Sequence, residues 1–182
     1  MRHLVYLFLF VLVACSESMP ESYQPLPQAI ELDNFTLYNQ DNENVGQAEL
    51  LGKWSLVFFG YTYCPDVCPT TLAELNRVAK NVERDDFQVV MISVDPQRDT
   101  PEQLKSYIEY FNPKFKGWSG DIGQIEHLTR LMHIFFQKQP HGESYLMDHS
   151  SQVVLINPQG QYQGFFTAPL DEKAMSEYLR TL

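Results

Sequence analysis

The chain contains two kinds of apolar pattern. Residues 55–59 and 87–94 are apolar at nearly every position, which is typical of strands buried on both faces of a sheet. Elsewhere apolar residues recur at every third or fourth position, which predicts helices. These helical segments are 71–83, 100–111, 125–135 and 171–182. Strands separated by helices predict a parallel sheet that is covered on both sides.

Polar residues mark the expected starts of two helices. Thr71 and Glu74 fit a capping box at the beginning of the first helix. Thr100 followed by Pro101 fits the N-cap and the first position of the second helix.

Two hairpins are also expected. Residues 35–38 and a strand at Val45 are joined by a polar bridge, and residues 152–156 and 161–166 are joined by a turn at 157–160. The resulting order is β-α-β-α-(α)-β-β-α. It predicts an α/β, thioredoxin-like fold with a central, mostly parallel sheet flanked by helices, an N-terminal β-hairpin and one inserted helix.

The N-terminus has the pattern of a targeting segment. Arg2 precedes an apolar run that is too short to span a bilayer comfortably, so we expect residues 1–14 to be a signal peptide. Leu-Val-Ala-Cys at positions 12–15 resembles a bacterial lipobox, in which Cys15 carries lipid; an ordinary signal peptide or an uncleaved anchor is the alternative. Residues 15–29, which are rich in Ser, Glu, Pro and Gln, predict a lipidated flexible tether, and residues 30–182 predict one domain.

Composition narrows the classes of function. The net charge of −10 argues against a nucleic-acid partner, because phosphate binding requires clustered Lys and Arg. With Cys15 lipidated, only Cys64 and Cys68 of the three cysteines remain as thiols. Two cysteines are too few for a disulfide framework, although disulfides persist in an exported compartment.

Cys64 and Cys68 stand where the strand at residues 55–59 gives way to a helix, a place where open α/β sheets bind ligands. The i, i+4 spacing brings both sulfurs to one side, and a helix N-terminus lowers a thiol pKa. Three residues separate them, against the usual two in thioredoxin-like oxidoreductases, which leaves room for a soft metal. A structural disulfide or two inert core thiols are the alternatives, but Pro65 and Pro69 hold the segment open.

His149 directly precedes the predicted strand at residues 152–156. In thioredoxins a cis-proline at this point faces the cysteine pair, whereas residues 145–157 contain no proline. A histidine there would complete a site of two sulfurs and one nitrogen. The alternative, a satisfied or exposed histidine, is the usual role of a lone one. His127, His133 and His141 are expected to be surface or packing residues. Met132 and Met147 are candidate thioether ligands for Cu(I), although their spacing favours core filling.

Three segments, residues 60–72, 93–101 and 145–151, together resemble the Sco/SenC family of copper chaperones. The resemblance implies a membrane-anchored domain that binds one copper, as Cu(I) or Cu(II), through Cys64, Cys68 and His149. It also implies that Asp95, and Asp148 beside the histidine, tune the site without binding the metal themselves. The alternative role for each is to cap a loop.

The resemblance also implies partners. The protein would receive copper from a donor protein and deliver it to cytochrome c oxidase subunit II or another envelope cuproprotein. Alternatively, it would keep the thiols of the dinuclear copper site of that subunit reduced. The protein would lie on the periplasmic side of a bacterial membrane, held by lipid where many members use a transmembrane helix. No enzymatic turnover is required of such a chaperone.

A second hypothesis is a thiol-disulfide oxidoreductase of the cell envelope. In that case Cys64 and Cys68 form a redox-active catalytic pair that cycles through a mixed disulfide, and His149 is not required. A peroxidase relative is a third, weaker option, because the sequence shows no threonine and arginine arrangement of the kind that binds peroxide.

Overall fold

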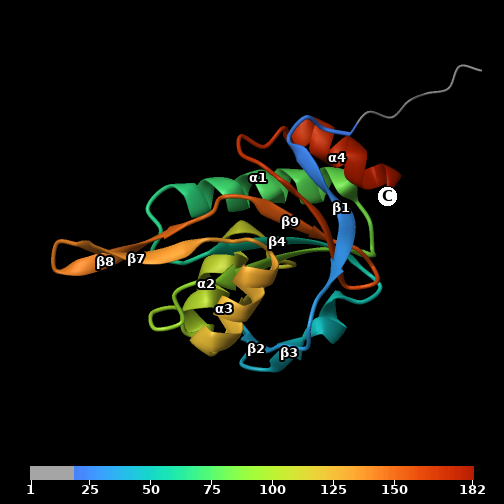
Figure 1. The fold of residues 1–182 in the computed structure, drawn as a ribbon. Helices are drawn as coiled ribbons and strands as arrows, with labels where there is room; N and C mark the ends of the chain where they lie inside the picture. The colour runs from blue at the N-terminus through green and yellow to red at the C-terminus, as the bar shows by residue number, and fades with distance from the viewer. Residues whose placement is uncertain (1–18) are drawn as a thin grey trace, which may run out of the picture.

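The computed structural model describes residues 19–182, which form an eight-stranded mixed sheet, four α-helices and a separate two-stranded hairpin (Figure 1). The strands of the large sheet lie in the order β1-β10-β9-β4-β5-β6-β2-β3. The elements along the chain are β1 (Tyr23–Glu31), β2 (Thr36–Asn39), β3 (Asn44–Gly46), a 3-10 turn η1 (Gln47–Leu50), β4 (Trp54–Gly60), α1 (Val67–Val82), β5 (Phe87–Ser93), α2 (Pro101–Phe111), β6 (Lys116–Ser119), α3 (Ile122–Leu131), β7 (Phe136–His141), β8 (Ser144–His149), β9 (Val153–Ile156), β10 (Gln161–Phe166) and α4 (Glu172–Thr181).

The two apolar runs form the centre of the sheet. β4 and β5 pair in parallel along their whole length, from Trp54 opposite Phe87 to Gly60 opposite Ser93. β9 pairs with the other edge of β4 in antiparallel register. Nearly every side chain of these three strands is buried, since helices cover both faces of the sheet. The predicted thioredoxin-like α/β architecture is therefore confirmed.

The helices form a layer on each face of this sheet (Figure 1). α1 and α4 pack side by side, and α1 also contacts α2. Figure 1 shows α1 and α4 on one side of the sheet and α3 on the other. Since β4 and β5 are parallel, their carboxyl ends meet at one edge, and the loops that follow them lie close together there.

Two helix boundaries differ from the sequence prediction. α1 begins at Val67 with Asp66 as its N-cap, so the capping box predicted at Thr71 lies inside the helix. Pro69 is tolerated in the first turn because the N–H that it lacks would have no intrahelical acceptor.

The other difference is at the end of α3, which stops at Leu131. His133 was expected within this helix and instead adopts a left-handed backbone conformation with φ 53° just after it. The amide of Ile134 then donates to the carbonyl of Thr129 at 2.8 Å, which turns the chain towards β7.

The N-terminal strand β1 lies partly where the sequence predicted a flexible tether. β1 pairs with β10 in antiparallel register, so residues 23–29, expected to be flexible, form an edge strand of the main sheet. Pro25 and Pro27 are compatible with this place because an edge strand leaves some N–H positions unpaired. The predicted signal peptide and Cys15 lie outside the described residues.

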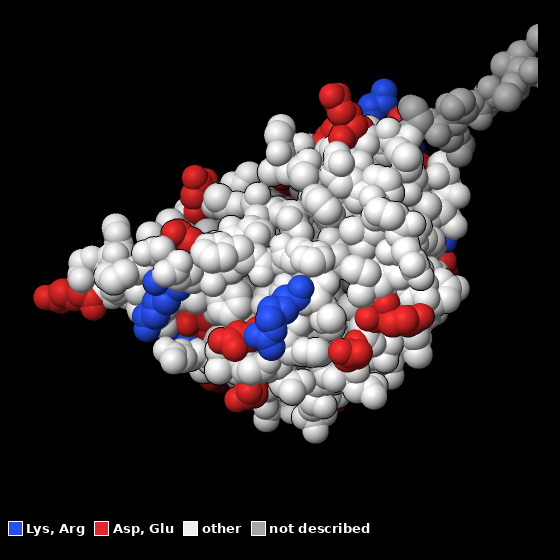
Figure 2. Space-filling view, viewed as in Figure 1, with Lys and Arg blue, Asp and Glu red and all other residues white. Residues whose placement is uncertain are grey.

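Hydropathy and charge add two observations. None of the helices in residues 19–182 is long and apolar enough to cross a membrane. On the face drawn in Figure 2, basic side chains are few and separated, and acidic side chains are spread among them.

Candidate metal centre

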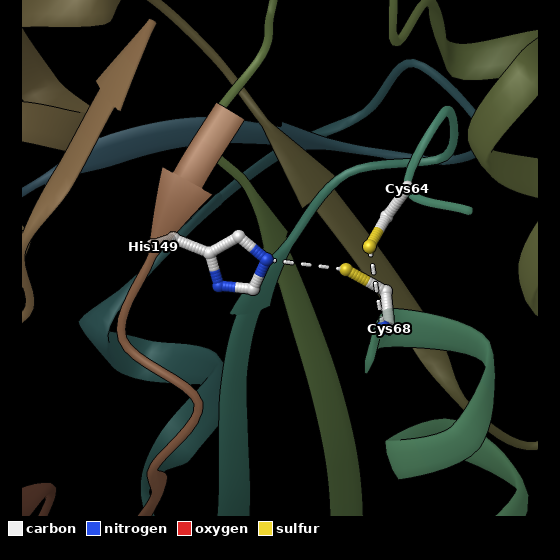
Figure 3. A group of neighbouring side chains, drawn as sticks. All are labelled: Cys64, Cys68 and His149. Atoms are coloured by element: carbon white, nitrogen blue, oxygen red, sulfur yellow. Dashed lines mark hydrogen bonds between the residues drawn. The ribbon is translucent and has the colours of Figure 1, made fainter. Parts of the chain in front are cut away.

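Cys64, Cys68 and His149 come together at the carboxyl edge of β4 (Figure 3). Cys64 lies in the loop that follows β4, Cys68 in the first turn of α1, and His149 at the end of β8. Their sulfur atoms and a ring nitrogen all lie within 4.8 Å of one another. The structure therefore brings all three predicted ligands to one point.

The two cysteines differ in exposure and in ionisation. Cys68 is fully buried and Cys64 is half-buried, and both are free thiols. The backbone N–H of Cys68 donates to Sγ of Cys64 at 3.4 Å, because this amide belongs to the open first turn of α1. A hydrogen bond from the Cys68 thiol lowers the pKa of Cys64 to about 3, with a smaller contribution from His149. The same contact and burial raise the pKa of Cys68.

The imidazole of His149 is held with one nitrogen facing the sulfurs. Its Nδ1 lies 3.0 Å from the carbonyl oxygen of Ser150, which accepts only, so Nδ1 carries the proton. Nε2 then has a free lone pair and lies 3.3 Å from Sγ of Cys68. The rings of Phe58 and Tyr61 both meet the imidazole edge-on, with centroids 5.9 Å away, and fix its orientation.

A buried carboxylate anchors the loop that carries Cys64. Asp99 is fully buried and accepts hydrogen bonds from the hydroxyls of Thr62 and Ser93, each at 2.6 Å. It also accepts from the backbone N–H of Thr62 at 3.1 Å. Burial raises the pKa of Asp99. Asp99 was not identified from the sequence, although it lies in the segment 93–101 that resembles the Sco/SenC family.

Asp95 contacts no ligand directly. Its carboxylate, which is 3% exposed, pairs with Arg98 and accepts a hydrogen bond from the hydroxyl of Tyr145 at 2.9 Å. Tyr145 belongs to the strand that carries His149, so Asp95 reaches the site through that strand. Arg98 and Tyr145 were not identified from the sequence.

Asp148 lies next to His149 in β8. Successive side chains of a strand point to opposite faces, so Asp148 points away from the side on which His149 meets the sulfurs. It is exposed, and no hydrogen bond or ion pair of its side chain is found among residues 19–182. The geometry therefore gives Asp148 no supporting contact to the site.

The other histidines and methionines lie away from the centre. His127 is 3.5 Å from Asp33 on the surface, and His133 and His141 are exposed. Met132 and Met147 are buried in the core. These roles agree with the expectation that they are surface and packing residues.

The donor set suits a soft monovalent metal. Two thiol sulfurs and one neutral imidazole nitrogen can surround a single ion, and thiolate ligands select Cu(I), while imidazole also serves Cu(II). Cys64, ionised and half-buried, provides the accessible ligand, and Cys68 the buried one. Hard cations such as Mg²⁺ and Ca²⁺, which prefer oxygen, fit this group poorly.

Comparison with known proteins gives a consistent result. The family model described as SCO1/SenC matches residues 24–182. A putative copper-binding protein of Stutzerimonas stutzeri is 36% identical over 149 residues, covering 80% of this chain and 73% of that protein. A SCO2-like protein of Rickettsia conorii is 38% identical over 153 residues, covering 81% and 74%.

Solved structures agree. Bradyrhizobium japonicum ScoI with copper bound is 35% identical, with a TM-score of 0.77 over 84% of this chain and 99% of that one. Arabidopsis thaliana ScoI with copper bound is 31% identical, with a TM-score of 0.77 over 82% and 95%.

Proposed function

Because this chain belongs to the SCO1/SenC family, we propose that it is a copper chaperone that binds one copper ion through Cys64, Cys68 and His149 and passes it to a partner. The observation that carries the proposal is the convergence of two sulfurs and one nitrogen within 4.8 Å. The copper named in the descriptions of the Bradyrhizobium and Arabidopsis structures supports the choice of metal.

Each side chain has a distinct part in carrying this cargo. The lowered pKa of Cys64 keeps its sulfur ionised at neutral pH, ready to accept an incoming Cu(I). Burial of Cys68 keeps the opposite side of the site away from water and small thiol competitors. Release follows by ligand exchange, in which a partner's thiolate replaces the half-buried Cys64 first. No oxidation or reduction is needed for this exchange.

We propose cytochrome c oxidase subunit II, or another cuproprotein of the cell envelope, as the client, with a separate copper donor protein upstream. Family membership supports this choice. We also propose that residues 1–14 are a signal peptide and that lipid on Cys15 tethers the domain on the periplasmic side of a bacterial membrane. Fractionation of cells that express Cys15→Ser tests the anchor: the variant should leave the membrane fraction, and retention there contradicts it.

The test of copper binding begins with fully reduced protein. Titration with Cu(I) against a chromophoric chelator should give one ion per chain, and the Cys64→Ser and Cys68→Ser variants should each lose most of the affinity. Loaded protein should then transfer copper to a reduced acceptor domain that contains a dinuclear copper site. A stoichiometry far from one, or wild-type affinity in both variants, contradicts the proposal.

A second function is favoured by the asymmetry of the two thiols. The Cys64 thiolate can attack a partner disulfide, forming a mixed disulfide and releasing one partner thiolate. Cys68 then passes its proton to the first released partner thiolate and attacks Sγ of Cys64, which releases the second partner thiolate and leaves a Cys64–Cys68 disulfide. The partner gains two electrons and this protein loses two, so a separate reductant must restore it.

The two functions separate experimentally. A Cys68→Ser variant that accumulates a mixed disulfide with an oxidised client domain supports the reductase, provided that His149→Ala reduces the same client at the wild-type rate. Absence of the trapped species removes it.

A further inference from the structure

The Arg98 guanidinium lies between the loop that carries Cys64 and the strand that carries His149. Its central carbon is 3.7 Å from the ring centroid of Tyr145, 4.8 Å from that of Tyr63 and 5.7 Å from that of Tyr61. All three distances fall within the range of cation–π attraction. Tyr61 and Tyr63 precede Cys64 in its loop, and Tyr145 precedes His149 in β8. One side chain therefore contacts both the cysteine loop and the histidine strand.

Hydrogen bonds fix the guanidinium in this position. Nε donates to the carboxylate of Asp95, and Nη1 donates to the backbone carbonyl of Tyr145 at 3.1 Å. Tyr145 in turn donates its hydroxyl to Asp95 at 2.9 Å. Arg98, Asp95 and Tyr145 thus form a closed ring of contacts, which we name the Arg98 bracket.

The Tyr145 ring has a second cation beside it. Nζ of Lys138 lies 3.6 Å from its centroid, and the central carbon of Arg98 lies 3.7 Å from the same point. Both contacts lie within the range of cation–π attraction and restrict the rotation of the ring.

Side-chain contacts, including those of the buried Met147, hold the hairpin that carries His149 to the rest of the protein. Within residues 19–182, β7 and β8 pair with each other and not with the large sheet, from Phe136 opposite His149 to His141 opposite Ser144. Figure 1 shows this hairpin projecting from the body of the protein. The bonds between Phe135 and Ser150 tie its two ends together without attaching it to the main sheet.

We propose that Arg98 is a positioning residue for the metal centre, which holds the β7–β8 hairpin against the cysteine loop and so sets the distance between the imidazole of His149 and the two sulfurs. The bracket itself consists of side chains and backbone groups of this chain and involves no metal. Its effect on copper rests on the proposed function.

The chain offers a closely matched control. Arg84, at the opposite end of β5, also binds a carboxylate and a backbone carbonyl: its Nε and Nη2 donate to Asp86, and Nη1 donates to the carbonyl of Leu179. Its side chain is 22% exposed, against 19% for Arg98. Arg84→Gln and Arg98→Gln therefore remove equal charge from side chains of similar exposure, although Asp86 is 45% exposed and Asp95 3%, and only the second touches the bracket.

The first measurement uses metal-free, reduced protein. Residual dipolar couplings of the β7–β8 amides, referred to those of the large sheet, report whether the hairpin keeps a fixed orientation. Arg98→Gln should reduce them, whereas Arg84→Gln should leave them at wild-type values. Tyr145→Leu, which removes the ring and keeps the Arg98–Asp95 pair, should act like Arg98→Gln and serves if that variant does not fold. Unchanged couplings in both bracket variants overturn the proposal, whatever the protein binds.

The second measurement is a double-mutant cycle on Cu(I) affinity. Arg98→Gln should weaken binding by about 10–100-fold, as is usual when a residue that orients a metal ligand is removed. In a His149→Ala background the same substitution should have almost no effect, because Arg98 acts through the imidazole. Arg98→Lys should not rescue binding, since a lysine lacks the planar fork that stacks and donates at once. Equal losses in both backgrounds, or full rescue by lysine, overturn the proposal. If the wild-type protein binds no copper, the proposed function fails while the dipolar couplings still test the bracket.

Discussion

Nε2 of His149 lies 3.3 Å from Sγ of Cys68, while Nδ1 of the same ring lies 3.0 Å from the carbonyl oxygen of Ser150. The two contacts divide the work of the imidazole. The backbone carbonyl fixes the proton on Nδ1, and the free lone pair of Nε2 is left for a ligand bond beside the buried sulfur. Such a bond from the second ring nitrogen is a common feature of metal-binding histidines.

Removal of this imidazole should weaken the site without abolishing it. We expect His149→Ala to retain Cu(I) on the two thiolates with an affinity at least about tenfold lower, since a ligand contributes no less than the groups that orient it. Cu(II) binding should suffer more, because the nitrogen is the donor that suits this ion. Chelator competition measures the first effect and visible absorption the second. His127→Ala, which removes a surface histidine near Asp33, is the control. Equal affinities in the two variants would show that His149 is not a ligand.

The low pKa of Cys64 predicts its reactivity. A thiolate, and not a thiol, attacks iodoacetamide, so a lowered pKa keeps Cys64 reactive as the pH falls, until the pH reaches the lowered pKa of about 3. In the reduced, metal-free protein we expect the alkylation rate of Cys64 to be almost constant from about pH 5 to pH 8, a range below the ordinary thiol pKa of about 8.5. Cys68 should remain unmodified, because its pKa is raised and its side chain is buried. Peptide mass spectrometry assigns the modified residue.

The Cys68→Ala variant tests the cause of this reactivity. The substitution removes the Cys68 thiol, whose hydrogen bond contributes most to the lowered pKa of Cys64. The alkylation rate at pH 6 should therefore fall relative to the rate at pH 8. A flat profile in this variant would assign the effect to His149 and the start of α1 instead. A wild-type profile that rises steeply through about pH 8.5 would contradict the lowered pKa itself.

Gly60 gives a prediction about packing beneath the site. A Cβ at this position would lie 2.7 Å from Cε1 of Phe58 and 3.1 Å from Sγ of Cys68. Gly60→Ala must therefore displace the buried sulfur or the ring that contacts His149. We expect a loss of about 1–3 kcal/mol in the free energy of unfolding, together with weaker Cu(I) binding.

The control for Gly60 lies in the same sheet. In β6, a Cβ at Gly117 would meet Cγ1 of Ile108 at 3.0 Å and Cβ of Leu104 at 3.5 Å, and none of the ligands. Gly117→Ala should lower the free energy of unfolding, measured in urea, but leave copper affinity unchanged. If both variants bind copper like the wild type, the sulfur of Cys68 has more room than the geometry indicates.

The central strands and the three candidate ligands were predictable because local signals mark them. The apolar runs at β4 and β5 identify strands buried on both faces, and the strand-to-helix change places Cys64 and Cys68 at a carboxyl edge. For His149, the prediction rested on its position directly before the strand at residues 152–156 and on the family resemblance. Hydropathy alone would not distinguish this residue from His133.

The elements that escaped prediction either lack an apolar run or depend on distant partners. β7 and β8 contain several polar residues and lie outside the main sheet, so neither shows the apolar run of a buried strand. Arg98 gains its role only when the cysteine loop and β8 meet around it. β1 contains two prolines and resembles a linker locally, yet its pairing with β10 makes it a strand. For Arg98 and β1, the deciding contacts are separated from the residue by tens of positions in the sequence.

Tyr23 tests the correction at the N-terminus. It is 4% exposed, and its ring centroid lies 4.9 Å from that of Phe166 in β10 and 4.9 Å from that of Tyr178 in α4. The ring thus joins the edge of the sheet to the last helix. Tyr23→Ala should lower the free energy of unfolding by about 3–5 kcal/mol, the usual cost of truncating a large buried aromatic residue.

Tyr110→Ala provides the comparison, because that side chain is 84% exposed and its removal should change the stability by no more than about 0.5 kcal/mol. Urea unfolding of both variants, followed by circular dichroism, measures the difference. A flexible tether over residues 23–29 would make the two substitutions equivalent, since neither ring would then contribute to the core. A large loss for Tyr23→Ala alone would place the start of the folded domain at β1.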